Sequence, residues 1–494
     1  MFRNRLLSTS ALSIFAWLLV LVCTLYALSG QVGAPLAAGG AVLGLIALWW
    51  ANRQRSRHLD QLLLSIYPMA RDWPVHSKTF PAYKLVDLDA AANWLAEQQP
   101  NTLTLASEHH EPLSFLLVHS GRFERPIRPP SKIARASGPD SEVFVPVDSF
   151  RVLRNTRDGS GQRAIVRLKY YHNSTMVTVE IAAPQEHDAV RLMEQLLQRA
   201  AQHTIYRNHL LRVTFGHQTR DSYDDEDTVA AIDIAFLREA AVTDADIVLE
   251  DELSAILEHA IVDFHHRRAE LMQLGVPGRR GVLFYGPPGT GKTYTCRYLA
   301  QRLAPITTIV ASGHALLRMQ DICALAAVLQ PALVLLEDVD LVFASRELNP
   351  FNTTLGEFMD QLDGFGTQHE VIFLLTTNAL ERVEAAIKDR PGRVSQCIYF
   401  GPPSAKLRQR YLARALAPYT FNGDLGRIVR QTEGVSQAFL KELVYRAVQL
   451  ASLEQRERSN GLLIDAEHLE AALNELLQGG GEAGRSIIGF RLTA

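Results

Sequence analysis

The sequence predicts an α/β domain, a parallel sheet flanked by helices, followed by a small helical lid. A transmembrane helical hairpin and a small α+β domain are predicted to precede it. Three features support this prediction. The stretch from Leu6 to Asn52 contains no Lys, Arg, Asp, Glu or His. A glycine-rich loop ending in Gly-Lys-Thr follows a short apolar strand at 282–285. A continuous apolar run at 332–336 ends directly in carboxylates.

Length and composition exclude several classes of protein. The chain has 494 residues, which corresponds to about three domains. It is 47% hydrophobic and 21% charged, as folded globular proteins are. The net charge of −3 argues against a dedicated nucleic-acid binder. The 4 cysteines include no C-x-x-C pair, so we expect neither a disulfide framework nor a zinc site, and a reducing compartment suits the chain.

The uncharged N-terminal stretch is too long for one membrane span of about 20 residues and suits two. We predict a hairpin over 1–58, with helices at about 9–29 and 34–52 joined by a short loop containing Gly30 and Pro35. Arginines flank it on both sides, and Lys and Arg favour the cytoplasmic side of a membrane. Both ends should therefore be cytoplasmic. A cleaved signal peptide is the alternative for the first apolar block.

The next region, 68–215, is predicted to be a small α+β domain. Its periodicity predicts helices at 87–99 and 186–203, and strands at 102–105, 113–118, 142–147, 163–171 and 175–181. The proline-rich basic segment 121–140 reads as a solvated surface loop, with contact to lipid headgroups or a partner as the alternative. An acidic run at 221–227 marks a linker, which we place at 216–230.

The glycine-rich loop fits the pattern G-x-x-x-x-G-K-[ST], which cradles phosphates. Its glycines let backbone N–H groups turn toward the anion, and the following helix directs its positive dipole end there. The lysine supplies a charge for the β- and γ-phosphates, and the threonine hydroxyl can bind Mg²⁺. The predicted nucleotide-binding residues are Gly286, Pro287, Pro288, Gly289, Thr290, Gly291, Lys292 and Thr293.

Two acids follow the apolar run, as expected where a buried parallel strand meets a ligand. One carboxylate should join the Mg²⁺ shell and the next should activate the attacking water. A second buried strand, 371–375, ends in Thr-Thr-Asn, and the Asn378 amide could position that water. Two arginines at a later turn could reach the phosphates of a neighbouring subunit. The candidate catalytic residues are Glu337, Asp338, Asn378, Arg390 and Arg393, with Thr293 and Glu337 as candidate metal ligands.

Together these motifs resemble an AAA ATPase module, with the core at 231–402, the helical lid at 403–480 and a tail at 481–494. The lead-in to the loop and the Glu-Asp order resemble the Bcs1-like branch, whose members are membrane-anchored. The resemblance implies ATP and Mg²⁺ as cofactors and a homo-oligomeric ring, usually a hexamer. It also implies that Asn378 is the first sensor, that Arg390 and Arg393 are arginine fingers, and that 363–365 is an inter-subunit signalling segment.

The sequence departs from the common family pattern in two places. Most members have Asp then Glu at the acidic pair, whereas this chain has Glu337 then Asp338, which we interpret as a working variant. Threading members carry an aromatic pore loop after the second strand, whereas 313–317 reads Gly-His-Ala-Leu-Leu. The chain also lacks the H-E-x-x-H motif of membrane-bound AAA proteases.

We therefore predict a membrane-anchored, ring-forming ATPase that remodels, extracts or translocates protein clients. The bilayer and an unidentified client protein are its predicted partners, with 68–215 choosing the client. The predicted location is the bacterial inner membrane, as a multi-pass protein with a cytoplasmic ATPase domain, and the mitochondrial inner membrane is the alternative. The alternative function is a nucleotide-controlled oligomeric scaffold with slow turnover. A nucleic-acid remodeller is disfavoured by the charge.

Overall fold

The computed structural model describes residues 58–99, 101–121, 125–127, 131–154, 162–170, 175–216, 231–238, 242–243, 247–340, 366, 368–381, 395–454 and 462–479. The chain divides into two compact units, Met1–Ile205 and Tyr206–Ala494. Among the described helices, none is both long and apolar enough to span a bilayer. The two predicted spans at 9–29 and 34–52 lie outside the described residues.

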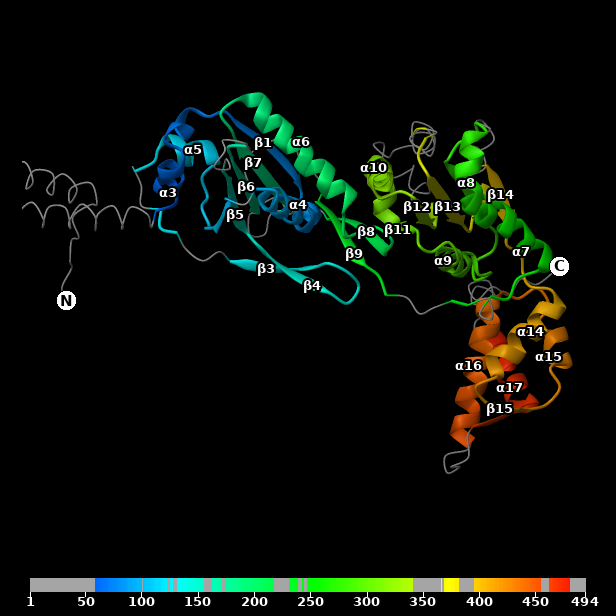
Figure 1. Ribbon diagram of the computed structural model, residues 1–494. Coiled ribbons are helices and arrows are strands. Elements are labelled where there is room, and N and C mark those ends of the chain that lie inside the picture. Colours follow the sequence, from blue (N-terminus) through cyan, green and yellow to red (C-terminus); the bar gives the residue numbers. More distant parts are fainter. Residues whose placement is uncertain are drawn as a thin grey trace, which may run out of the picture. The chain divides into compact units, whose positions relative to one another are not determined.

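The first unit contains a five-stranded antiparallel sheet with helices on both faces. The sheet order is β1-β7-β6-β5-β2. Its strands are β1 (Val75–Pro81), β2 (Leu103–Ala106), β5 (Asp148–Leu153), β6 (Ala164–Tyr170) and β7 (Met176–Ala182). Its helices are α3 (Leu59–Ile66), η1 (Pro68–Asp72), η2 (Ala82–Lys84), α4 (Leu85–Glu97), α5 (Leu113–Val118) and α6 (Glu186–Gln202). Figure 1 shows α6 running along this sheet.

Each face of this sheet buries its own core because successive strand residues point to opposite sides. Val166, Val177 and Val179 pack with α4 and α6. The neighbouring positions Phe150 and Ile165 pack with α3 and α5. The near-continuous burial of β5 and β6 follows from this two-sided covering.

Two predictions for this region are wrong. The run Leu113–Val118 forms the helix α5 rather than a strand, because a short apolar run cannot distinguish a buried strand from a buried helix turn. The predicted surface loop 121–140 contains the strand β3 (Lys132–Ala136), which pairs with β4 (Glu142–Pro146) in a separate antiparallel hairpin.

The face of the sheet under α5 holds a buried cluster of charges. The fully buried Arg167 guanidinium donates to Asp148 at 2.9 and 2.7 Å and to Glu180 Oε2 at 3.1 Å. Glu180 Oε1 accepts from the backbone N–H of Leu113, which begins α5. The cluster thus joins β5, β6, β7 and α5, and removing one partner of such a buried pair typically costs about 3–5 kcal/mol.

Asp87 makes the stability of the first unit depend on pH. Its carboxylate accepts from Thr204 Oγ1 at 2.7 Å and from Ile205 N at 2.9 Å, and burial raises its pKa to about 6. A raised pKa means that the folded state favours the protonated carboxyl. This contribution to stability is fully present below the unfolded-state pKa of about 3.9, and it is lost as the pH rises through the folded-state pKa near 6. An Asn at position 87 cannot ionise. As the pH rises from 4 to 7, the free energy of unfolding of Asp87→Asn should therefore increase by about 1–3 kcal/mol relative to that of the natural chain.

Native-state hydrogen exchange of the α4 amides at pH 4, 5.5 and 7 measures this difference in the full chain. Asp188→Asn, which removes a partly exposed carboxylate paired with Arg191 on α6, is the control and should leave the pH slope unchanged. Parallel pH slopes for Asp87→Asn and the natural chain would contradict the prediction.

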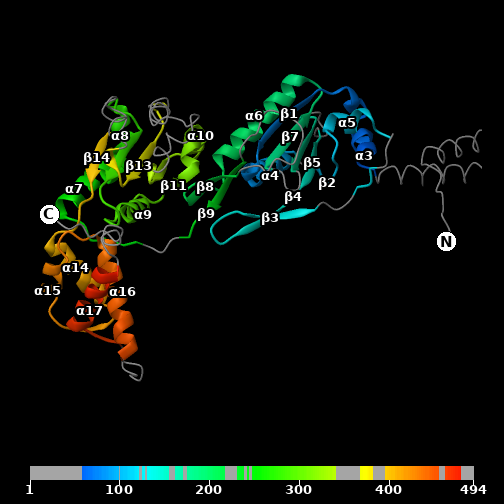
Figure 2. The same ribbon diagram turned by 180° about the vertical axis from the view of Figure 1, so that it is seen from behind.

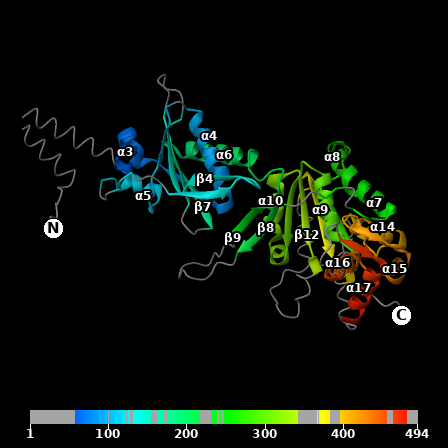
Figure 3. The same cartoon turned by 90° about the horizontal axis from the view of Figure 1, so that it is seen from below.

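The second unit contains a seven-stranded sheet in the order β14-β10-β13-β12-β11-β8-β9. All neighbouring strands are parallel except β8 and β9. The strands are β8 (Leu210–Gly216), β9 (Ala231–Phe236), β10 (Arg280–Tyr285), β11 (Thr307–Ser312), β12 (Ala332–Glu337), β13 (Val371–Thr377) and β14 (Gln396–Tyr399). Figures 2 and 3 show this sheet from behind and from below.

Helices cover the parallel strands. The segment α7 (Asp251–Leu257), η4 (Glu258–Asp263, π-helical) and α8 (Phe264–Gln273) shares one core with α9 (Lys292–Arg302) and the strands β10, β12 and β13. The segment η5 (Gly313–Arg318) and α10 (Met319–Leu329) connect β11 to β12. The strands read as unbroken apolar runs because both faces of the sheet are buried.

The division between the units falls earlier than the predicted boundary at 215. Strand β8 lies within the predicted 68–215 region, yet it pairs in parallel with β11 of the second unit. Strand β9, on the far side of the predicted linker, pairs with β8 in antiparallel register. The linker residues 217–230 lie outside the described residues. A period-2 pattern shows that a segment is a strand without showing which sheet it joins.

A helical lid follows β14. It consists of α14 (Ala405–Leu416), α15 (Gly426–Gln431), α16 (Gln437–Glu454) and α17 (Ala466–Gly479), with a small parallel pair of strands, β15 (Thr420–Asn422) and β16 (Leu463–Asp465). Its own core includes Leu412, Phe439, Leu443 and Leu473. These helices gather into one cluster in Figures 1 and 3.

Candidate functional site

The phosphate loop connects β10 to α9 and depends on left-handed backbone. The φ angles are +142° at Gly286, +76° at Gly289 and +93° at Gly291, a region that side chains disfavour. Gly291 is the N-cap of α9, so the loop ends at the N-terminal, positive end of that helix. The glycine spacing in the sequence is thus explained by backbone geometry.

The lid packs directly on this loop. The backbone N–H of Ala438 donates to the Gly289 carbonyl at 3.0 Å. A Cβ at Gly289 would lie 2.8 Å from the Ala438 Cβ and 2.9 Å from the Ser436 hydroxyl. Gly289 is therefore required both for its φ angle and for the close approach of α16. This contact couples the position of the lid to the conformation of the loop.

Lys292 lies under the loop with little exposure to solvent. Its side chain is 5% exposed, and Nζ donates to the carbonyls of Gly286 and Pro287 at 2.8 Å each. Burial lowers the pKa of this ammonium group to about 8, and the nearby Asp338 and Asp340 oppose that shift. A compact cation held inside a ring of backbone is suited to meeting an incoming phosphate.

The acidic pair lies at the end of β12. Asp338 has a φ of +51°, which costs a non-glycine residue about 1–3 kcal/mol. Two polar residues of the neighbouring β13 tip hold it there. Its N–H donates to Thr376 Oγ1 at 3.0 Å, and Asn378 Nδ2 donates to its Oδ1 at 3.1 Å. The strained backbone turns the Asp338 carboxylate toward Asn378.

A third acid, Asp340, supports this arrangement from below. It is 4% exposed, and its Oδ1 accepts from Thr377 Oγ1 at 2.8 Å and from the Asn378 backbone N–H at 3.1 Å. Asp340 therefore positions the segment that carries Asn378. Asp340 is not among the predicted site residues, although three acids within four residues at a strand end are a signal for such a role.

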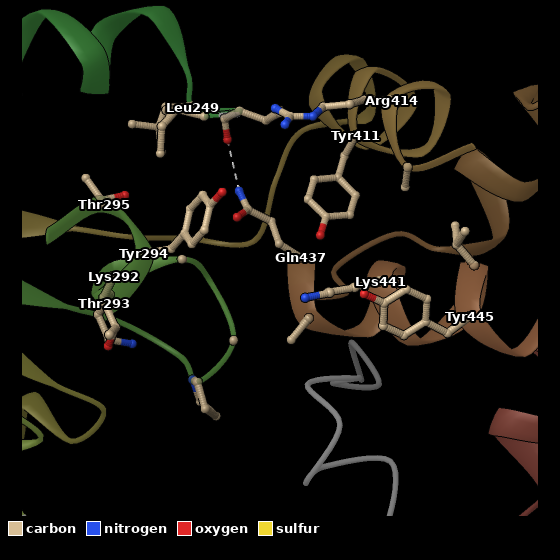
Figure 4. A pocket seen from close by; sticks show the side chains of 18 of the residues that line it. Leu249, Lys292, Thr293, Tyr294, Thr295, Tyr411, Arg414, Gln437, Lys441 and Tyr445 are labelled. Atoms are coloured by element: carbon tan, nitrogen blue, oxygen red, sulfur yellow. Dashed lines mark hydrogen bonds between the residues drawn. The ribbon is translucent and has the colours of Figure 1, made fainter. Parts of the chain in front are cut away.

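These elements border one cleft of about 760 Å³ between the core and the lid. Lys292, Thr293, Asp338 and Asn378 line it together with lid residues. Figure 4 shows Lys292 and Thr293 with the lid residues of this cleft. Glu337, at the tip of β12, is half-buried and is not among the lining residues. Arg390, Arg393 and the segment 363–365 lie outside the described residues. The structure thus brings together seven of the predicted site residues from three separate segments, since Pro288, Gly289 and Gly291 of the loop line the cleft as well.

The rest of the cleft was not predicted from the sequence. Val248 and Leu249, just before α7, form one wall. Tyr411 and Arg414 of α14 and Gln437, Lys441 and Tyr445 of α16 lie opposite (Figure 4). These residues carry no motif, because their only common property is their position around the cleft.

The sequence matches the family model "ATPase family associated with various cellular activities (AAA)" over residues 282–402. The chain carries an AAA ATPase domain. The match begins in β10 and ends just before the lid, so it includes the phosphate loop and the tips of β12 and β13. The predicted ATP-hydrolysing domain, with ATP and Mg²⁺ as its ligands, is confirmed.

Similar proteins match about half of this chain. An ATP-dependent zinc metalloprotease FtsH of Pelobacter propionicus is 32% identical over 256 residues, covering 48% of this chain and 40% of that protein. A 26S proteasome regulatory subunit 8 homolog of Schizosaccharomyces pombe is 29% identical over 252 residues, covering 47% of this chain and 60% of that protein. The chain thus spans between 40% and 60% of the length of these relatives.

The 494-residue sequence contains no H-E-x-x-H motif. The His-Glu pairs at His110 and His369 lack the second histidine of H-E-x-x-H. Within the described residues, no group of three or more His, Cys, Asp or Glu side chains could hold a metal ion.

Proposed function

We propose that the protein is a membrane-anchored, ring-forming ATPase that uses ATP hydrolysis to remodel, extract or translocate protein clients at the membrane. The observation that carries the proposal is the convergence of Lys292, Thr293, Asp338 and Asn378 on one cleft beneath the lid. The similarity to a proteasome regulatory subunit and to a protease described as ATP-dependent favours work on protein substrates.

The residues of the cleft suit a nucleoside triphosphate with Mg²⁺. The loop has three glycines at positive φ, where a Cβ would clash with Phe400 or with the start of α16, and Lys292 donates to two carbonyls of the same loop. The Thr293 hydroxyl lines the cleft, and Glu337 is the last residue of β12, directly before Asp338. Hydroxyl and carboxylate oxygens are the ligands that Mg²⁺ prefers. When bound, Mg²⁺ would neutralise charge on the transferring phosphoryl group. We assign Thr293 and Glu337 to holding it.

Asp338 is the proposed general base. It lines the cleft, whereas Glu337 does not, and Asn378 donates to one of its carboxylate oxygens. Asn378 thereby orients the carboxylate for a water attacking the γ-phosphate. In the order Glu337–Asp338, the residue that acts as the base therefore has the shorter side chain. The positive φ of Asp338 helps to direct its carboxylate into the cleft. Arg390 and Arg393 are proposed to complete the site of a neighbouring subunit.

The membrane anchor and the ring rest on the sequence. The uncharged stretch from Leu6 to Asn52 with flanking arginines supports a hairpin with both ends in the cytoplasm. The likeness to the Bcs1-like branch supports the same anchor and a homo-oligomer, with a hexamer as the expected size. The part of the first unit that follows the proposed anchor in the sequence and precedes the AAA domain is the proposed client-binding part. The bacterial inner membrane is the proposed location.

A nucleotide-controlled scaffold with slow turnover is the second candidate. The observation that favours it is η5, which follows β11 where threading members of the family carry an aromatic pore loop and which contains no aromatic residue. A ring whose pore loops lack aromatic residues could assemble when it binds ATP without translocating an extended polypeptide. The rate of turnover separates the two candidates.

Steady-state ATP turnover of the detergent-solubilised full chain, measured over a range of protein concentrations, tests the proposal. Mass photometry of the same samples reports assembly. Turnover per chain should rise as rings form, because each site needs its neighbour's arginine. Assembly on nucleotide with negligible turnover would favour the scaffold, and full turnover by a monomer would contradict a ring.

A further inference from the structure

We infer that a groove between α4 and α6 of the first unit binds the main chain of an extended polypeptide, largely independently of its sequence. This inference rests on the proposed function, because it assigns the recognition of a client to one surface of the first unit. It follows from the chemistry of the residues that line the groove.

The groove is a hollow of about 480 Å³ between the C-terminal halves of the two helices. Helices α4 and α6 pack side by side and share one core with the sheet (Figure 3). Trp94 of α4 supplies aromatic surface, and Arg199 is the one charged residue among the described residues of the lining. Six of the lining residues are glutamines: Gln98, Gln99, Gln162, Gln195, Gln198 and Gln202.

The part of α6 that borders the groove differs from the rest of that helix. Gln195, Gln198 and Gln202 recur at helical spacing, so they lie on one face of α6, and all three are exposed. One turn earlier the exposed side chains of α6 are charged, as at Arg191 and Glu194 and as is usual for a solvated helix face. The change from charged to neutral side chains coincides with the groove.

The charge of Arg199 is engaged within the protein. Its guanidinium lies over the Trp94 ring, 5.0 Å from the ring centroid, and its Nη1 is hydrogen-bonded to His203 Nε2. A cation over an aromatic face is attracted to it. This contact ties α6 to α4 and holds the indole at the groove. The polar groups that remain for a ligand are mainly neutral carboxamides.

Gln99 shows how a carboxamide of this groove pairs with main chain. In the orientation that satisfies both of its ends, Nε2 donates to the carbonyls of Arg154 and Gln162 at 3.0 Å each. Its Oε1 accepts from the backbone N–H of Gln162 at 3.3 Å. One side chain thus reads both the N–H and the C=O of a single residue.

The exposed glutamines can pair with a client in the same way. A carboxamide offers N–H donors and an acceptor oxygen, and an extended chain presents the N–H and C=O of alternate residues along each edge. Gln195 and Gln202 are separated by about 10 Å along the helix axis, the length of roughly three extended residues. Because every polypeptide has this backbone, and because a neutral groove repels neither acidic nor basic segments, recognition tolerates different sequences.

Fluorescence anisotropy of a labelled, uncharged twelve-residue peptide, titrated with the detergent-solubilised full chain in ADP, tests the inference. A second peptide has the same sequence with its central backbone amides N-methylated, so the donors are lost and the side chains are kept. N-methylation should weaken binding by about tenfold or more, because several hydrogen bonds are lost together. Two further peptides with equal charges of opposite sign should bind alike.

Variants of α6 connect the binding to the groove. The triple change Gln195→Ala, Gln198→Ala and Gln202→Ala should weaken the unmodified peptide by about tenfold and leave the N-methylated peptide nearly unaffected. These side chains are exposed and alanine favours a helix, so α6 should remain folded. Glu194→Ala, on the same helix outside the lining, is the matched control. Gln198→Glu should make the groove prefer the basic peptide over the acidic one.

Each contrary result has a distinct meaning. Equal affinity for the two uncharged peptides, or an unchanged affinity in the triple variant, would overturn the inference and leave the proposed function standing, with the client bound elsewhere on the chain. A triple variant that binds peptide normally but no longer assembles would make the groove an interface between copies. A natural chain that binds no peptide would refute the inference together with the client-binding role of the first unit, whereas ATP turnover and ring formation without peptide test the ATPase separately.

Discussion

Asp338→Asn is expected to lower steady-state ATP turnover by about 10² or more, the range for removal of a general base. Asparagine has the same shape and can still accept the hydrogen bond that Asn378 Nδ2 donates to Asp338 Oδ1. The structure of the cleft should therefore survive, and only the ability to take a proton from water is lost. Nucleotide affinity should be unchanged or slightly higher, because a negative charge near the phosphates is removed.

Turnover and ADP affinity, measured on the same preparations, separate the loss of chemistry from the loss of binding. Glu442→Gln is the matched control, because this acid lies on α16 outside the cleft and pairs loosely with Arg446 at 3.9 Å. Glu337→Gln should instead raise the Mg²⁺ concentration needed for half-maximal turnover. If Asp338→Asn kept full activity while Glu337→Gln lost it, the two carboxylates would have the opposite roles.

Arg390→Ala is the second change with a large expected effect, again about 10² or more in turnover. A guanidinium lent by one subunit stabilises the charge that develops on the phosphoryl group in its neighbour's site. The loss should appear in turnover, whereas the chain's own nucleotide affinity, which depends on its own phosphate loop, should change little. The measurement is turnover of purified rings at saturating ATP.

Mixed rings show whether the arginine acts between subunits. Asp338→Asn chains retain Arg390, and Arg390→Ala chains retain Asp338, so in an equal mixture roughly a quarter of the interfaces would pair an intact site with an intact arginine. Activity should therefore return on mixing two inactive variants. Lys292→Ala mixed with Asp338→Asn is the control without rescue, because both changes damage a chain's own site. Failure of the first mixture to regain activity would place the arginine within its own subunit.

The parts of this protein that could be predicted from sequence are those where local geometry dictates residue type. Positive φ angles favour glycine at Gly289 and Gly291, so the phosphate loop can be predicted from the glycine pattern alone. An apolar run such as 332–336 predicts a buried strand, because both faces of a parallel strand are covered and its residues are apolar on both sides. The prediction for Leu113–Val118 is wrong because five apolar residues among six fit a short helix as well as a strand.

The remainder of the site depends on strand order. Strand β13 lies between β10 and β12, although it follows both in the chain, and this order brings Asn378 beside Asp338 and the phosphate loop. The support from Asp340 and the positive φ of Asp338 arise only where those strand tips meet. No periodicity within one segment encodes such a neighbour.

The sequence by itself determined that a nucleoside triphosphate could be held, because the phosphate loop is a local structure whose residues are set by backbone angles and charge. Only the tertiary structure decided which carboxylate faces the cleft and which lid side chain reaches the segment before α7. Gln437 shows the reason. Its hydrogen bond to Val248 spans 189 positions of the chain, and such contacts follow from packing of the lid against the core.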